Sequence, residues 1–178
     1  QTDSIPLQLA QGVRVLLIDV WSGQATQAIG SGRSVVRTSA SSHAEALRIA
    51  NEELGPEVVD AALRIAESIA GPAVGPERRY MCHGLCETGS TPFVESLEAI
   101  RGWMVANPGE VVTLFVEDHV PAELVAEDVV AAGLLPMVAT PPPVGEPWPT
   151  LGDLVAADQR LLVMVENGTG GDDAPWLV

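Results

Sequence analysis

The chain has 178 residues, of which 47% are hydrophobic and 19% charged, enough for one hydrophobic core or part of a larger domain. Its 24 acidic residues outnumber its 9 basic residues and give a net charge of −15, which argues against general nucleic-acid binding because so anionic a chain repels a phosphate backbone. No apolar run reaches the roughly 20 residues of a membrane-spanning helix, and residues 1–4 lack the basic and apolar regions of a signal peptide. We therefore expect a soluble, globular chain.

Strands and helices alternate in the predicted secondary structure. Apolar, β-rich runs predict buried strands at 13–20, 79–82, 111–116 and 161–165. Helical spacing of apolar residues predicts helices at 91–106, 121–132 and 150–157. The last of these has Thr150 at its N-cap and Asp153 three residues later, a variant of the capping box. The alternation predicts an α/β fold with a parallel sheet.

Residues 22–78 do not fit this alternation, because a strand connection in such a fold is normally short. Two helical patterns lie within this range, one over 42–54 and one starting at Pro56, and Gly55 separates them. In the second pattern the apolar residues Val58, Ala62, Ile65 and Ile69 line one face. We therefore predict a single domain over 1–178 with a helical hairpin inserted at 22–78. The insertion is either a packed decoration or a lid that moves when the protein works.

Polar residues stand where the predicted strands end. Three strands run into the acids Asp19, Glu117 and Glu166, and the remaining one runs into His83. Because the C-terminal strand ends of a parallel α/β barrel open into one mouth, these side chains are expected to converge there. Asp19 and Glu117 then offer oxygen ligands for a divalent cation, with His83 nearby for proton transfer. The alternative is that each acid caps the following turn and the histidine is a structural group.

Two further histidines are less informative. Only alternate residues of an extended segment face the same way, so Glu117 and His119 are expected on one side. His119 is then either a partner of the site or a surface residue. His43 lies in the predicted insertion, is expected to face solvent and is assigned no role.

Cys82 and Cys86 stand on either side of His83. Adjacent Cys and His with one further Cys is not a usual zinc spacing, and nothing indicates a reactive thiol. We favour a short-loop disulfide that holds His83 in place, which would imply an oxidising compartment. Two buried, reduced cysteines are the alternative.

Several segments, read in chain order, resemble the catalytic X-type region of the phosphatidylinositol-specific phospholipase C superfamily, as found in bacterial phospholipase C-like phosphodiesterases. They are residues 8–14 (QLAQGVR), 17–21 (LIDVW), 82–84 (CHG), 107–114 (NPGEVVTL), 117–118 (ED) and 148–152 (WPTLG). The resemblance covers nearly the whole chain apart from 22–78. It implies part of a TIM-type barrel of parallel strands, whose mouth cleaves a phosphodiester with two histidines and, in many members, a calcium ion.

The resemblance also implies roles for individual residues. His83 matches the histidine that protonates the leaving oxygen, while Asp19 and Glu117 match acids that bind Ca²⁺ in the metal-dependent branch. That branch has a further acid two residues before the aspartate, where this chain has Leu17. The metal-independent branch has an arginine two residues after the aspartate, where this chain has Trp21. Ca²⁺ is the preferred expectation because both acids are retained, and the question stays open.

Other parts of the family pattern have no counterpart in this sequence. The first catalytic histidine of the family lies on a strand ahead of the segment that begins here at Gln1, and Glu166 matches no family residue. Four predicted strands are also too few for an eight-stranded barrel. We therefore expect a partial barrel domain, which in isolation would expose sheet edges.

The implied function is that of a phosphoric diester hydrolase of the phospholipase C type, acting on a phosphodiester or phospholipid such as a phosphoinositide. A location outside the cell or in the cell envelope follows from the resemblance, as does peripheral contact with a membrane. Two alternatives are a catalytically inactive barrel that serves as a binding module and a glycerophosphodiester phosphodiesterase, which is a related barrel.

Overall fold

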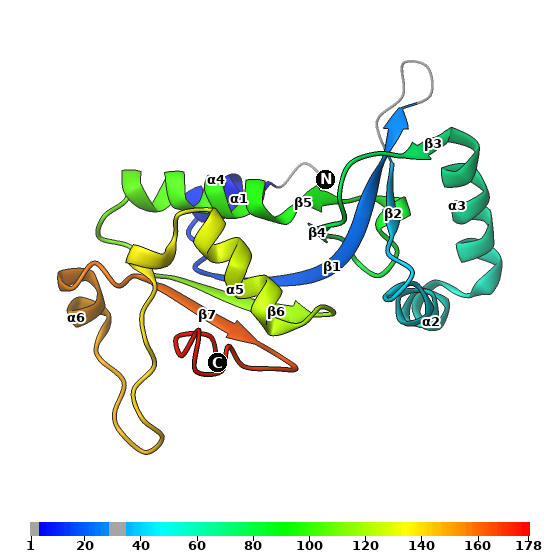
Figure 1. Ribbon diagram of the computed structural model, residues 1–178. Coiled ribbons are helices and arrows are strands. Elements are labelled where there is room, and N and C mark those ends of the chain that lie inside the picture. Colours follow the sequence, from blue (N-terminus) through cyan, green and yellow to red (C-terminus); the bar gives the residue numbers. More distant parts are fainter. Residues whose placement is uncertain (1–3, 29–34) are drawn as a thin grey trace. The chain divides into compact units, whose positions relative to one another are not determined.

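The computed structural model describes residues 4–28 and 35–178 (Figure 1). The chain divides into two compact units. The first unit comprises Gln1–Ile18 and Val94–Val178, and the second unit is Asp19–Phe93. The fold is mixed α/β, and the described strands form an open sheet with both parallel and antiparallel pairs. None of the helices that the structure describes is long and apolar enough to cross a bilayer.

The first unit alternates helices and strands as predicted. It contains α1 (Ile5–Ala10), the start of β1 (Val15–Ala28), α4 (Phe93–Ala106), β6 (Val112–Asp118), α5 (Ala122–Ala131), the 3-10 turn η2 (Leu135–Met137), α6 (Leu151–Ala156) and β7 (Leu161–Val165). Strands β6 and β7 are parallel and in register from Val112 opposite Leu161 to Val116 opposite Val165. The predicted strands at 111–116 and 161–165 are therefore confirmed, and so are the three predicted helices.

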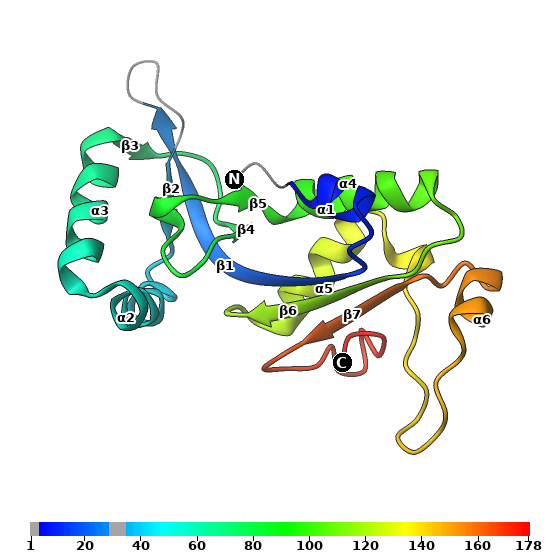
Figure 2. The ribbon, with the colours of Figure 1, turned by 180° about the vertical axis from the view of Figure 1, so that it is seen from behind.

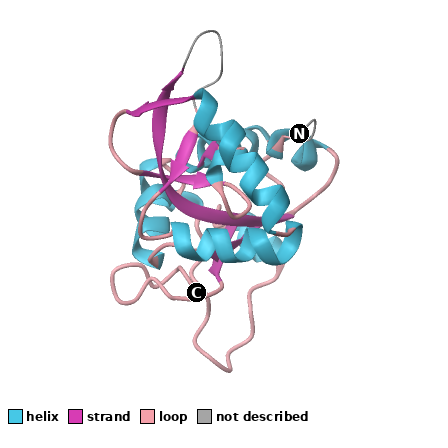
Figure 3. Cartoon of the chain, turned by 90° about the vertical axis from the view of Figure 1, so that its right-hand side faces the viewer, coloured by secondary structure: helices cyan, strands magenta, loops and turns pink. Residues whose placement is uncertain are grey.

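Local signals explain where these helices begin and what they bury. The apolar positions Leu97, Ile100 and Met104 of α4 recur at helical spacing and are fully buried. At the start of α6, the Asp153 backbone N–H donates to Thr150 Oγ1 and the Thr150 backbone N–H donates to Asp153 Oδ2. This capping box confirms the predicted one. A long loop without helix or strand joins η2 to α6 over residues 139–150 (Figures 1 and 3).

The second unit combines a helical hairpin with short antiparallel strands. It contains most of β1, β2 (Val36–Thr38), α2 (His43–Leu54), α3 (Pro56–Ile69), β3 (Ala70–Ala73), β4 (Arg78–Met81), the 3-10 turn η1 (Cys86–Thr88) and β5 (Thr91–Pro92). Both helices predicted within 22–78 are present, and α2 and α3 pack against each other (Figures 1 and 2). Residues 29–34 of the predicted insertion lie outside the described residues.

The prediction of a wholly parallel sheet is wrong in this unit. Strand β4 runs antiparallel to β1, with Val20 opposite Met81, and β2 and β3 also pair antiparallel with β1. An apolar run predicts a strand but not its direction, which depends on how the connection returns to the sheet. Here the connection itself supplies two short strands, which the sequence did not reveal because they have only three and four residues.

The core of the second unit lies between the hairpin and the strands. Its buried members include Trp21, Tyr80, Cys82, Leu85 and Cys86. The predicted inner face of α3, which contains Val58 and Ile65, is instead exposed, and Val59 and Ala66 are buried. The two faces differ by one residue, or about 100° around the helix. The helix was therefore predicted correctly, whereas the side that packs was not.

Candidate functional site

His83 lies between two carboxylates in the second unit. Its Nδ1 is 2.6 Å from Oδ2 of Asp19, and its Nε2 is 2.9 Å from Oε2 of Glu53. Asp19 comes from β1, Glu53 from the last turn of α2, and His83 from the loop after β4. These three residues form a hydrogen-bonded row, which we call the His83 array.

Antiparallel pairing brings Asp19 and His83 together. Val20 lies opposite Met81 in the β1–β4 pair, so residue 19 is at the level where the chain leaves β4 toward His83. The sequence pattern predicts that the two residues meet because each ends a parallel strand. Instead, Asp19 stands inside the longer strand β1, and only His83 follows a strand end. The two side chains are adjacent, but for a different reason from the one predicted.

The loop that carries His83 is held on both sides. Cys82 and Cys86 form the predicted disulfide, with their Cα atoms 5.0 Å apart, and both residues are buried. Gly84 has a φ of +72°, and a Cβ at this position would lie 3.4 Å from the carbonyl oxygen of Ala46 in α2. Glycine therefore allows the left-handed turn, and the loop lies against α2 at this point.

The array favours a protonated histidine. The hydrogen bond to Asp19 has the largest effect and raises the pKa of His83 above its ordinary value of 6.5; partial burial works against this, and the Glu53 contact raises the pKa further. The side chain of Asp19 is 17% exposed, compared with 46% for Glu53 and 69% for His83. The ring is thus anchored by a mostly buried acid at Nδ1, while its Nε2 proton lies on the more open side.

Glu117 lies in the first unit and has a different partner. Its Oε1 is 3.3 Å from Nε2 of His119, so these residues share a side as the strand period predicts. The His119 side chain is only 6% exposed, which makes the surface alternative for this histidine wrong. The prediction that Glu117 joins Asp19 and His83 stays a prediction.

Asp118, between these two residues, has a structural role. Its Oδ1 accepts hydrogen bonds from the backbone N–H groups of Glu166 at 3.0 Å and Asn167 at 2.8 Å. The Asp118 side chain therefore fixes the turn that follows β7. Glu166 itself is exposed and contributes its backbone to this contact.

The described residues contain no group of three or more His, Cys, Asp or Glu side chains arranged to hold a metal ion. Carboxylate oxygens such as those of Asp19 and Glu117 suit Ca²⁺ chemically. However, Oδ2 of Asp19 already accepts the hydrogen bond from His83, and Glu117 lies close to His119. These two acids do not by themselves make a calcium site, and the expected Ca²⁺ stays a prediction.

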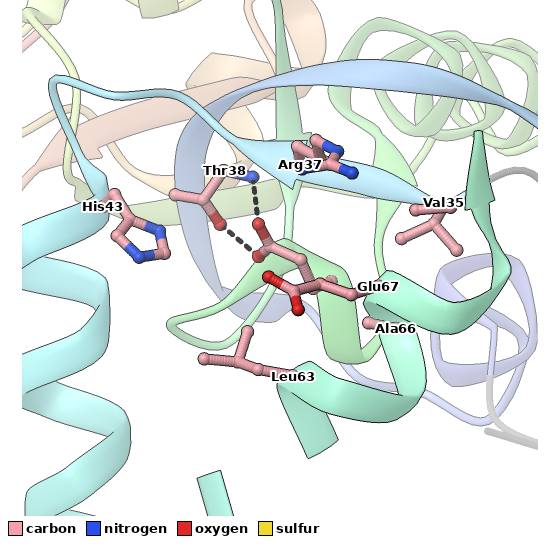
Figure 4. A pocket seen from close by; sticks show the side chains of 9 residues that line it. Val35, Arg37, Thr38, His43, Leu63, Ala66 and Glu67 are labelled. Carbon is pink, nitrogen blue, oxygen red and sulfur yellow. Dashed lines mark hydrogen bonds between the residues drawn. The ribbon is translucent and has the colours of Figure 1, made fainter. Parts of the chain in front are cut away.

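A hollow of about 290 Å³ lies elsewhere in the second unit, between β2 and the helical hairpin (Figure 4). Its lining includes Val35, Thr38, His43, Leu63 and Glu87, so His43 is half-buried rather than fully solvent-facing. The carboxylate of Glu87 accepts from the Thr38 N–H at 2.8 Å and from its hydroxyl at 2.7 Å, and Thr38 Oγ1 accepts from the Cys86 N–H. These contacts tie β2 to the disulfide loop.

Glu53 is the member of the His83 array that sequence analysis missed. An acid in an amphipathic helix usually faces solvent, and nothing in its pattern distinguishes Glu53 from its neighbour Glu52. A signal was nevertheless present, because Ala46, Ala50 and Glu53 follow the i, i+4, i+7 spacing of one helix face. Ala46 and Ala50 are buried on that face.

Comparison with known proteins adds a family match. A model of the PI-PLC X domain family matches residues 73–178. A PI-PLC X domain-containing protein of Arabidopsis thaliana is 33% identical over 104 residues, which are 53% of this chain and 24% of that protein. No solved structure matches the chain. The matched family range contains His83 and Glu117, whereas Asp19 and Glu53 precede it.

Proposed function

Because this chain belongs to the PI-PLC X domain family, we propose that it supplies the general acid of a phosphodiesterase of the phospholipase C type. The observation that carries this proposal is the His83 array. A histidine with a raised pKa, oriented by Asp19 and with its other N–H facing the more exposed Glu53, has the properties that a general acid needs. His83 is also the residue that matches the family's proton donor by resemblance.

In the proposed reaction, the oxygen of water or of a neighbouring substrate hydroxyl attacks phosphorus and forms a new P–O bond. The P–O bond to the leaving alcohol breaks, and its electron pair goes to the leaving oxygen. His83 gives that oxygen the proton on Nε2, while the Asp19 carboxylate holds Nδ1–H and stabilises the imidazolium beforehand. The attacking oxygen gives its proton to a base, the role that the resemblance implies for the family's first catalytic histidine.

We further propose the substrate class and setting that the resemblance implies. The substrate is the phosphodiester of a phospholipid such as a phosphoinositide, and the chain forms part of a TIM-type barrel. Location in the cell envelope or outside the cell is supported by the Cys82–Cys86 disulfide, which suits an oxidising compartment. Asp19 and Glu117 are the residues that would hold Ca²⁺ in such a barrel, as the resemblance implies.

The test is turnover of a phosphodiester by the whole protein that carries this chain. His83→Ala should lower the turnover rate by at least about a hundredfold, the lower end of what a general acid contributes. His43→Ala is the matched control because His43 belongs to the same unit but not to the array, and it should leave the rate unchanged. An unchanged rate in His83→Ala would remove His83 from the mechanism, and binding without turnover in the wild type would favour a binding module.

A further inference from the structure

We propose that Glu53 is a built-in competitor of the substrate: its carboxylate holds the place at Nε2 of His83 that a phosphodiester oxygen must take. This inference rests on the proposed function, because it concerns the same proton donor. Substrate binding then exchanges one anion for another, and Glu53 swings away from the ring as the phosphodiester arrives.

The His83 ring has no N–H group left for a substrate oxygen while Glu53 is in place. A protonated imidazole has two N–H groups, and in this structure both already have carboxylate acceptors. The Nδ1 donor faces Asp19, which is mostly buried and fixed within strand β1. The Nε2 donor faces the more exposed Glu53 at 2.9 Å. A substrate oxygen can therefore reach a proton of His83 only by replacing Glu53.

The charge of the array also opposes a second anion at the ring. Asp19, Glu53 and a protonated His83 together carry a net charge of −1, so an incoming phosphodiester anion would be repelled while Glu53 stays in place. When Glu53 leaves, the remaining ion pair of Asp19 and His83 is neutral. A phosphodiester with one negative charge then brings the net charge at the ring back to −1.

Glu53 lies in the last turn of α2, on the side of the helix that faces the His83 loop. Ala50 lies on the face of the helix that packs near Gly84, and Glu53 follows one turn later, which directs it toward His83. A negative charge in the last turn of a helix opposes the helix dipole, and α2 has no basic residue there. Helix stability therefore does not explain this acid, whereas its contact with His83 does. Its flexible side chain can rotate into solvent without moving the backbone.

The experiment measures binding of dimethyl phosphate, a small phosphodiester monoanion, to the whole protein. The His83 ring is followed by NMR at a pH low enough that it is charged in every variant. Glu53→Gln should bind at least about threefold more tightly than the wild type, the size expected when one charge of an exposed pair is removed. Glu52→Gln is the matched control. It makes the same charge change at the preceding residue, which pairs with Arg48 and not with His83.

Equal affinities of the wild type and Glu53→Gln would overturn the inference. So would tighter binding by Glu53→Gln that persists when His83 is also replaced by Ala, because the competition requires the ring. In kinetics, Glu53→Gln should lower KM; a lower kcat at unchanged KM would instead make Glu53 part of the proton transfer and contradict competition. Dimethyl phosphate binding needs no turnover, so an inactive protein would defeat the proposed function without deciding this inference.

Discussion

Asp19 and His83 are 64 residues apart in the sequence, and Oδ2 of the first lies 2.6 Å from Nδ1 of the second. The short antiparallel pairing of β4 with β1 makes this contact, and the disulfide loop keeps His83 at that level. The carboxylate is mostly buried and the ring is mostly exposed. A fixed acid therefore orients a ring whose other nitrogen is open to exchange of partners.

The first prediction concerns the charge of His83. An NMR titration should give a pKa above 6.5, because the charged ring donates to two carboxylates. Since the folded pKa is raised, the array stabilises the fold below pH 6.5 and loses this contribution as the pH rises through the folded value. Asp19→Asn should lower the pKa more than Glu53→Gln, because the Asp19 contact is shorter and less exposed. An unchanged pKa in Asp19→Asn would contradict this ranking.

The second prediction concerns the disulfide. The test uses protein that was produced in an oxidising compartment and then denatured without reduction. A thiol reagent should label neither Cys82 nor Cys86 in this protein. Replacing both Cys82 and Cys86 by Ala should cost about 2 kcal/mol of unfolding free energy, the entropy expected for a closed loop this short. Denaturant unfolding measures the loss, and labelling of both thiols in the wild type would show that the bond is absent.

The third prediction concerns Arg160, whose side chain is 3% exposed. Its Nε donates to Asp158, and its NH1 group donates to the carbonyls of Met104, Asn107 and Glu110, which joins the end of α4 to the strands that follow. Arg160→Met should cost about 3 kcal/mol, because the buried carbonyl of Met104 and the part-buried carbonyls of Asn107 and Glu110 lose a charged donor. Denaturant unfolding provides the measurement.

Arg48→Met is the control for this loss. Arg48 forms an exposed pair with Glu52 one helical turn away, and its replacement should cost less than about 0.5 kcal/mol. Equal losses in the two variants would mean that the Arg160 contacts add nothing to stability.

The fourth prediction concerns Arg14 and Glu110. The Arg14 guanidinium lies 2.7 Å from the Glu110 carboxylate and over the ring of Trp103, and this hydrogen bond lowers the pKa of Glu110 below its ordinary 4.5. A lowered folded pKa stabilises the protein above 4.5 and loses this effect as the pH falls through the folded value. Glu110→Gln should therefore melt below the wild type near neutrality and match it in strong acid. A difference in melting temperature between the two proteins that grows as the pH falls would contradict this prediction.

Sequence periodicity predicted most of the elements because strands and helices are encoded locally. Leu97, Ile100 and Met104 mark the buried face of α4, and Thr150 with Asp153 marks the start of α6. The direction of β4 could not be predicted in the same way. Its four residues indicate a strand, but they do not indicate the direction in which the chain returns to the sheet. The packing side of α3 was likewise wrong, since apolar residues occupy two adjacent faces of that helix.

The candidate site was predictable only where residues stand out by type. Asp19 and His83 were singled out as polar residues at the ends of apolar runs, and they are in contact. Glu53 was not, because one acid among several in a helix acquires its partner only when α2 packs against the loop at Gly84. The spacing of Ala46, Ala50 and Glu53 places the acid on one helix face, but the partner of that face depends on tertiary structure.

The most direct measurement of the central claim, that His83 protonates the leaving oxygen, compares two leaving groups. Whole protein and its His83→Ala variant are assayed on a phosphodiester with an alkyl alcohol as leaving group and on one with p-nitrophenol. The alkyl oxygen needs a proton to leave, so the variant should lose at least about a hundredfold on that substrate, whereas nitrophenolate leaves without one and the loss should be far smaller. Equal losses on the two substrates would contradict general acid catalysis by His83.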